Sequence, residues 1–296
     1  MAIGAISGGT QKAAITGIFK QVEQIQGGEY VGELIMEVPS NAASNLYQWF
    51  LNGVIVREWI GARKYRQGKM AEFTIINRKW EISEAWELDM VDDNPEIIAQ
   101  VVNPVARAIV EHKYQLALEA LINNNTCYDG GVFFRTSHPS YQEGVTFSNL
   151  QTGTGTSAAN ILADYNTCML KYRSMKKENG YSLFPGNFTV GCLYPPALDS
   201  VMRTNFAVAK QAGGGDNQYL NAVALRSCGE LSDANDYYFY IKDGTYMKPV
   251  VIQLRKSFAM KFKEDRDEEN LLKLLGDARY EAAVGSPYVI TKVTNT

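Results

Sequence analysis

The sequence is poor in the side chains that most often carry catalysis or bind metals. It has two histidines, His112 and His138, and its four cysteines stand singly at 127, 168, 192 and 228, without a CxxC pair. No cysteine or glutamate lies at a ligand spacing from His138, which argues against a zinc motif. Isolated cysteines are typical of reduced thiols in a cytosolic protein. We therefore expect no metal, no cofactor and no catalytic residue.

The sequence also lacks an excess of positive charge, a long apolar run and a signal peptide. Lys and Arg number 29 against 32 Asp and Glu, so no global field exists that would hold nucleic acid. No uncharged apolar run reaches the ~18 residues of a membrane-spanning helix. The first residues lack a basic start followed by an apolar stretch. We expect a protein that folds in a cytoplasm and does not enter a membrane.

Glycine-rich and acidic segments do not complete a ligand-binding motif. Residues 153–158 match the loose dinucleotide fingerprint, but the preceding VTFSNLQ is too polar for the buried strand that this motif requires. The glycines at 213–215 are not followed by Lys and Ser or Thr. A calcium loop is matched in composition alone by Asp265, Asp267, Glu268 and Glu269. A nucleotide-binding α/β enzyme stays open as the alternative from another functional class.

The strongest positive signal is a long helical pattern from Asp92 to Asn125. Asn94 and Pro95 are typical of an N-cap and a first helical position, and the asparagines at 123–125 tolerate the left-handed turn that ends a helix. Pro104 predicts a bend unless packing overrides it. At ~1.5 Å per residue the helix spans roughly 42 Å, so it must lie along something extended. We call it the spine helix, and its apolar stripe is Ile98, Val101, Val102, Val105, Ile109, Leu116, Ala120 and Leu121.

Two segments before the spine helix suggest contacts with other chains. Residues 1–45 are small, polar and glycine-punctuated, which fits either an arm that gains order on a neighbour or a disordered leader. Residues 46–61 predict a strand, and 54–92 a long hairpin with a basic middle. An isolated ribbon is only marginally stable, so it should rest on another chain; an edge hairpin of a single domain is the alternative. Its predicted inner face is Trp80, Ile82, Trp86, Leu88 and Met90.

After residue 150 the pattern changes to short strands that alternate with helices. Residues 150–156 form a small-residue linker. Helices are predicted at 157–179 and 195–209, and strands at 188–194, 222–231 and 237–241, which together indicate a compact α/β domain. Strands return from about Met247, with the acidic segment 265–277 between them.

Several motifs in these segments resemble the major head subunit of Mu-like tailed phages. The resemblance covers roughly residues 45–142, is weak over 150–245, and continues in the tail at Lys248-Pro249 and Gln253. The motifs are specific in combination. They are Tyr47-x-Trp49, Glu58-Trp59-Ile60-Gly61-x-Arg63, Ile76-Asn77-x-Lys79-Trp80-Glu81, Asp92-Asp93-Asn94, Cys127-Tyr128-Asp129-Gly130, Phe133-Phe134 and His138-Pro139.

This resemblance implies the Hong Kong 97-type capsid fold, an α+β fold with five parts. These would be an N-terminal arm (1–45), a strand and E-loop hairpin (46–92), the first part of the P-domain with the spine helix (93–149), the A-domain (150–245) and a returning P-domain sheet (246–296). The function implied is a major capsid protein, and no enzyme. It would self-assemble through pentamers and hexamers into an icosahedral head around double-stranded DNA. A shell of an encapsulin-type protein compartment is the alternative with the same fold.

The resemblance also implies partners, and the charges of two segments suggest a contact between subunits. Residues 1–45 lack the character of a long charged scaffold segment, so we expect a separate scaffold protein or a chain already processed, and a portal. Packaged DNA would be held without sequence-specific binding, in a virion assembled in the bacterial host cytoplasm. The expected inter-subunit contact joins the E-loop residues Arg63, Lys64, Tyr65, Arg66, Lys69 and Met70 to the acidic surface Asp265, Asp267, Glu268 and Glu269 of a neighbour.

Overall fold

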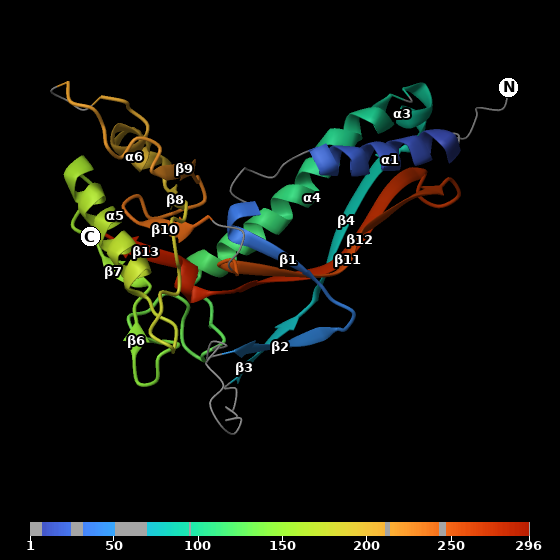
Figure 1. Cartoon of the computed structure of the whole chain (residues 1–296). Helices are drawn as coiled ribbons and strands as arrows, with labels where there is room; N and C mark the ends of the chain where they lie inside the picture. The colour runs from blue at the N-terminus through green and yellow to red at the C-terminus, as the bar shows by residue number, and fades with distance from the viewer. Residues whose placement is uncertain are drawn as a thin grey trace.

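The computed structural model describes residues 8–24, 32–50, 70–94, 96–210, 214–242 and 247–295. Figure 1 shows an elongated end, built from long strands and a long helix, and an α/β end. The helices are α1 (Gly8–Gln24), α3 (Leu88–Asp93), α4 (Ile97–Ile122), α5 (Ala158–Ser174) and α6 (Asp199–Phe206), with short 3-10 turns at Pro196–Leu198 and Pro287–Val289. The strands are β1 (Ile35–Pro39), β2 (Ser44–Phe50), β3 (Met70–Ile76), β4 (Arg78–Glu87), β5 (His138–Pro139), β6 (Thr146–Phe147), β7 (Leu150–Thr152), β8 (Val190–Tyr194), β9 (Val223–Ser227), β10 (Tyr237–Ile241), β11 (Val250–Asp265), β12 (Leu271–Val284) and β13 (Ile290–Thr294).

The spine helix is α4, which has 26 residues and continues through Pro104. Its start was predicted too early, because residues 88–93 form the separate helix α3. Asn94 is not the N-cap of α4 but the C-cap of α3, and its amide donates to the carbonyl of Met90 (3.1 Å). Pro95 lies outside the described residues. The predicted stop is confirmed, since α4 ends at Ile122 and Asn124 has φ of 51°.

The apolar stripe of the spine helix is confirmed as core. Val101 and Val102 are partly buried, and the other predicted positions are buried, namely Ile98, Val105, Ile109, Leu116, Ala120 and Leu121. Ala117 and Leu118 are buried as well, so the last turns of α4 are enclosed on more than one side. The reason is that this end of the helix packs against both sheets of the protein.

The first sheet has the strand order β1-β11-β12-β4 and lies under α4 (Figure 1). Trp80, Ile82 and Trp86 of β4 share the α4 side, as predicted. The predicted ribbon is wrong beyond Glu87, because Leu88 and Met90 lie in α3. Its resting place is also corrected: β4 pairs antiparallel with β12 of the same chain, from Arg78 opposite Tyr280 to Glu87 opposite Leu271.

Part of the predicted N-terminal arm forms α1, which lies along α4 of its own chain (Figure 1). Ile18 is buried in the main core and Ala14 in a smaller cluster around Leu88 and Ile98. A Cβ at Gly17 would stand 3.3 Å from Val102, so the two helices approach closely there. For residues 8–24 the alternative of a disordered leader is therefore wrong, and contact of the arm with a neighbour stays a prediction.

The second sheet, at the α/β end, has the order β7-β13-β10-β8-β9. Alternate residues of β10 point to opposite sides: Tyr237 and Phe239 pack with α5 and α6, whereas Tyr238 and Tyr240 pack with the core of α4. The predicted helix at α5 and strands at β8 to β10 are confirmed. The last strand, β13, pairs with β10 and β7, so it leaves the β11–β12 sheet in which residues 246–296 were expected. The five-part domain division stays a prediction.

Candidate assembly surfaces

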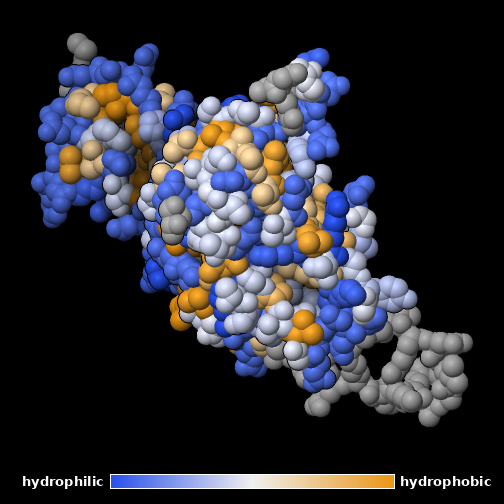
Figure 2. Space-filling model, turned by 90° about the vertical axis from the view of Figure 1, so that its left-hand side faces the viewer, coloured by the Kyte–Doolittle hydropathy of each residue, from blue (hydrophilic) through white to orange (hydrophobic). Residues whose placement is uncertain are grey.

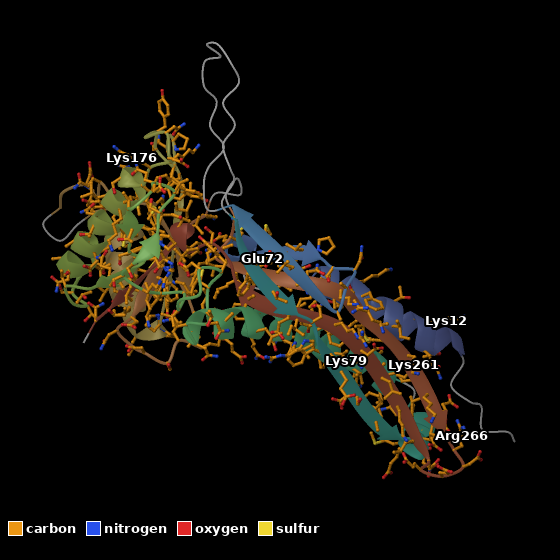
Figure 3. All side chains as sticks on the ribbon, turned by 90° about the horizontal axis from the view of Figure 1, so that it is seen from below. Lys12, Glu72, Lys79, Lys176, Lys261 and Arg266 are labelled. Carbon is orange, nitrogen blue, oxygen red and sulfur yellow. The ribbon has the colours of Figure 1, made fainter. Side chains whose placement is uncertain are left out.

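The strands β2 and β3 form a two-stranded ribbon that runs from Ser44 opposite Ile76 to Phe50 opposite Met70. In Figure 3 it crosses one end of the long sheet, with Glu72 marking it. Tyr47, Phe73 and Ile75 on its inner face pack on Val251 and Ala283 of that sheet. Its outer face carries Leu46 and Ile76, which are 53% and 67% exposed. The ribbon is therefore fixed by one face and offers apolar side chains on the other.

A single buried glutamine holds both strands of this ribbon to the sheet. Gln253 of β11 has no exposed surface. Its Oε1 accepts a 2.7 Å hydrogen bond from the Tyr47 hydroxyl, and its Nε2 donates to the carbonyl of Ile75 (3.2 Å). Burial raises the pKa of Tyr47, so this hydroxyl keeps the proton that it donates. The sequence named Gln253 only through the family resemblance and gave no sign of this role.

The predicted E-loop contact residues are not placed by the structure. Arg63, Lys64, Tyr65, Arg66 and Lys69 lie outside the described residues, and Met70 is described only as the first residue of β3. The hairpin itself was predicted at 54–92. The described pairing places its two strands at 44–50 and 70–76 instead, with 78–87 in the first sheet.

The predicted acidic surface lies at the turn between β11 and β12, at the far end of the molecule near Arg266 (Figure 3). Lys273 forms ion pairs with Asp265 (3.5 Å) and with Glu269. Burial raises the pKa of Asp265, but the Glu268 amide and Lys273 together lower it by more. The pKa of Asp265 therefore lies below its usual range. Within the described part of the chain, Asp267 and Glu268 are exposed and their carboxylates form no ion pair. These two are the members left available to a partner.

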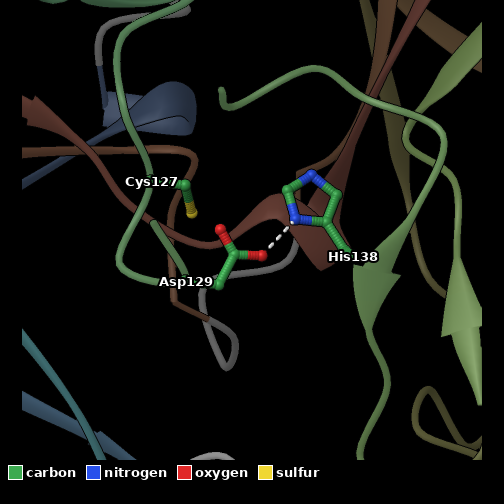
Figure 4. Close-up of side chains that lie close together, drawn as sticks. All are labelled: Cys127, Asp129 and His138. Carbon is green, nitrogen blue, oxygen red and sulfur yellow. Dashed lines mark hydrogen bonds and ion pairs between the residues drawn. The ribbon is translucent and has the colours of Figure 1, made fainter. Parts of the chain in front are cut away.

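Figure 4 shows a buried group that the sequence did not predict, formed by Cys127, Asp129 and His138. Their potential ligand atoms lie within 4.8 Å of one another. The Asp129 carboxylate already accepts hydrogen bonds from Arg135 (2.5 Å) and faces His138 Nδ1 (2.7 Å), and a guanidinium so close disfavours a further cation. Burial raises the pKa of Cys127 to about 12, so the free thiol stays protonated and is a poor nucleophile. The group fixes the loop after α4.

A second unpredicted group ties the segment before β1 to the α/β end. The Glu33 carboxylate is nearly buried and accepts hydrogen bonds from Arg226 (2.9 Å), Lys242 (2.7 Å) and the Tyr240 hydroxyl (2.6 Å). Burial raises the pKa of Glu33, but the three donors together lower it by more than burial raises it. The pKa therefore lies below its ordinary value. No sequence pattern signals this group, because its members stand about two hundred residues apart.

The glycine-rich loop at 153–158 is filled by its own chain. A Cβ at Gly153 would collide with the side chain of Asn295, whose Oδ1 accepts from the Gly155 amide (2.9 Å). The Thr154 amide donates to Asp164 (3.2 Å), and Ser157 caps α5. The amides that would face a phosphate are therefore already bonded. In the described residues no helix is long and apolar enough to cross a membrane.

Comparison with known proteins identifies relatives of this chain. A family described as Mu-like prophage major head subunit gpT matches residues 12–176. The chain is 34% identical over 110 residues to the Mu-like prophage FluMu major head subunit of Haemophilus influenzae, and 30% identical over 112 residues to the major capsid protein of Escherichia phage Mu. These matches cover 36% and 37% of both chains, so the chain spans little more than a third of each relative's length.

Solved structures show the same fold at low sequence identity. The bacteriophage JBD30 procapsid subunit has a TM-score of 0.54 at 17% identity, covering 98% of this chain and 76% of that one. The phage PhiM1 mature capsid gives 0.59 at 12% identity (89% and 86%), and a virus-like particle from Pyrococcus furiosus gives 0.58 at 8% (96% and 98%). The predicted α+β capsid fold of Hong Kong 97 type is confirmed. The family is described as a major head subunit, and these neighbours are subunits of a procapsid, a mature capsid and a virus-like particle.

Proposed function

Because the chain belongs to the family of Mu-like prophage major head subunits, we propose that it is the major capsid protein of a Mu-like phage head. Copies would assemble through pentamers and hexamers into an icosahedral shell around double-stranded DNA. Rings of this kind need surfaces that are not self-complementary. The observation that carries the proposal is the β2–β3 ribbon, which is fixed on its inner face and exposes Leu46 and Ile76 on its outer face.

The proposal is tested by expressing the chain with its genomic neighbours and examining the product by negative-stain electron microscopy. Closed shells that contain double-stranded DNA are expected, and a monodisperse monomer under these conditions would contradict the proposal. Packaged DNA would lie without sequence-specific contacts, which the net charge of −3 supports. Shells that contain an enzyme instead would favour the encapsulin-type compartment, which would have the same fold.

Within the shell, the basic E-loop residues Arg63, Lys64, Arg66 and Lys69 would meet the acidic turn of a neighbouring copy. Asp267 and Glu268 support this, because they are the exposed acidic residues of that turn outside its ion pairs. Exposed ion pairs contribute only ~0.2–1 kcal/mol each, so the strength of the contact would come from apolar burial. The charges would set the register of one copy on the next.

A charge-swap experiment tests this contact. The double variant Lys64→Glu with Lys69→Glu is expected to abolish particles in electron microscopy while the subunit stays folded, because like charges then face each other. Adding Asp267→Lys and Glu268→Lys should restore them. The control is Lys12→Glu with Lys20→Glu on α1, which changes the net charge equally. An unchanged particle yield in the first variant would refute the contact.

The remaining partners follow from the same role. A separate scaffold protein and a portal would take part in assembly, in the cytoplasm of the bacterial host. Mass spectrometry of the subunit from particles would show whether N-terminal residues are removed. With the strand positions corrected above, the arm, E-loop, P-domain and A-domain would each make separate contacts with neighbouring subunits.

A further inference from the structure

The same short loop follows α4 and α5 of this protein, and two features of its hydrogen-bonding pattern recur after α6. After α4, Thr126 bridges Val132, the Cys127 amide donates to the Gly131 carbonyl (2.7 Å), and the Phe133 amide donates to the Asn125 carbonyl (3.0 Å). After α5, fifty residues later, the corresponding bonds join Lys177 to Tyr181 (2.8 Å) and Leu183 to Met175 (2.8 Å), with a bridge between Lys176 and Ser182. The loop after α6 repeats the bridge and the outer bond, at Lys210–Asp216 and Asn217–Ala209 (2.9 Å).

A glycine with positive φ occupies the same place in each copy. Gly130 and Gly180 have φ of 80° and Gly214 has φ of 84°. Residues other than glycine rarely adopt this backbone conformation. The backbone of the loop is thus dictated by local geometry, and its side chains are free to differ. Comparing the first two copies position by position shows what each loop does.

The loop after α4 packs closely against its own chain. Gly131 follows the turn glycine there, and a Cβ at this position would collide with the guanidinium of Arg135. Phe134 of the same loop is buried in the core. The second copy also buries its matching residue, Phe184, against Tyr172 and Phe188. Both loops are therefore anchored in the same way.

The second copy differs at the position of Gly131, which is occupied by Tyr181. Tyr181 is 75% exposed, the highest value among the large apolar side chains of the described residues. Its amide donates to the Asn179 side chain (3.2 Å), and its carbonyl accepts from Lys177, so the backbone that carries the ring is held in place. A large ring on a fixed backbone loses little conformational entropy on binding, which suits it as an anchor of an interface.

The surroundings of Tyr181 indicate the charge of its partner. Residues 171–181 hold four cations, Lys171, Arg173, Lys176 and Lys177, and one carboxylate, Glu178, in a chain with net charge −3. The rest of each copy is therefore net acidic and complements this segment. In Figure 3 Lys176 lies at the border of the α/β end, away from the long sheet. Figure 2 shows hydrophobic groups on the α/β end as separate patches among hydrophilic ones.

We propose that Tyr181 is an anchor residue by which one copy of this chain binds the next copy in the shell. This inference rests on the proposed shell function and adds a specific contact of the α/β end to the ribbon contact described above. The contact is heterologous, with the basic tyrosine loop on one copy and an acidic-rimmed apolar surface on the other.

The test compares the wild-type chain with Tyr181→Ala and Tyr181→Phe, each expressed with its assembly partners. Tyr181→Ala should lower the particle yield by about tenfold or more, while its Tm stays within about 2 °C of wild type, because the side chain is exposed. Tyr181→Phe keeps the ring and should assemble normally. Full assembly of Tyr181→Ala would overturn the proposal.

A second measurement does not depend on how the alanine variant folds. The photoreactive residue p-benzoylphenylalanine at position 181 should crosslink two copies of the chain in assembled particles and none in separated subunits. A crosslink to nucleic acid, or none between copies, would overturn the proposal. If the wild-type chain formed no particles, the shell function and the contact would both fail; particles from wild type and from Tyr181→Ala alike would refute the contact alone.

Discussion

At the scale of single residues, His112 on the spine helix should make the stability of the protein depend on pH. Its Nδ1 shares a 2.7 Å hydrogen bond with the Tyr280 hydroxyl, and its ring packs edge-on against Trp80 at a centroid distance of 4.4 Å. Burial lowers the pKa of His112 from its ordinary value of 6.5, and nearby Glu119 raises it by less. The unfolded chain then binds more protons than the folded one, so stability is complete above about pH 6.5 and is lost as pH falls toward the folded-state pKa.

We therefore expect Tm to fall between about pH 7.5 and pH 5.5, and His112→Gln to reduce that slope. Calorimetry or thermal melts followed by circular dichroism at several pH values provide the measurement. Glu33 and Asp129 have lowered carboxylate pKa values, so their stabilisation is lost at lower pH and does not obscure this window. An equal slope in wild type and variant would show that His112 carries none of the dependence.

At the scale of elements, the packing of α1 on α4 gives a prediction with a neighbouring control. Ile18 is 1% exposed in the main core, whereas Phe19 beside it is 37% exposed. Ile18→Ala should lower the free energy of unfolding by about 2–5 kcal/mol, as is usual for a large-to-small change in a packed core. Phe19→Ala should cost clearly less. Urea unfolding measures both, and equal losses would mean that α1 does not pack on α4 in solution.

Elements with a strong local period were predictable, and their partners were not. The stripe from Ile98 to Leu121 has the helical period, and the core confirms it. Leu88 and Met90 were assigned to the strand because they continue its alternation of apolar and polar residues. The chain instead begins helix α3 at Leu88. Pairing of β4 with β12 joins residues almost two hundred positions apart, which no local pattern specifies. The acidic segment 265–277 was misjudged for the same reason, since most of it belongs to β12.

At the scale of the whole molecule, the candidate surfaces were only partly foreseeable. Family motifs pointed to Tyr47 and Gln253, but their shared hydrogen bond depends on the ribbon being folded across the sheet. Tyr181 is exposed because of its place in a loop whose backbone pattern recurs after α4 with a different sequence, so composition could not reveal it. The sequence predicted many of the helices and strands. Which of their surfaces stay exposed is decided only by how the chain folds.

Variants of Gln253, which holds the β2–β3 ribbon to the sheet, can distinguish an effect on folding from an effect on assembly. Gln253→Ala removes the acceptor of Tyr47 and the donor to Ile75, which should cost about 1–3 kcal/mol of stability and leave the ribbon free to change its angle. Because the ribbon offers Leu46 and Ile76 from a fixed position, particle yield should fall more steeply than subunit stability. Tyr47→Phe, which removes one of the two bonds, should lie between wild type and Gln253→Ala. If particle yield instead followed Tm alone across the three proteins, the orientation of the ribbon would not matter for assembly.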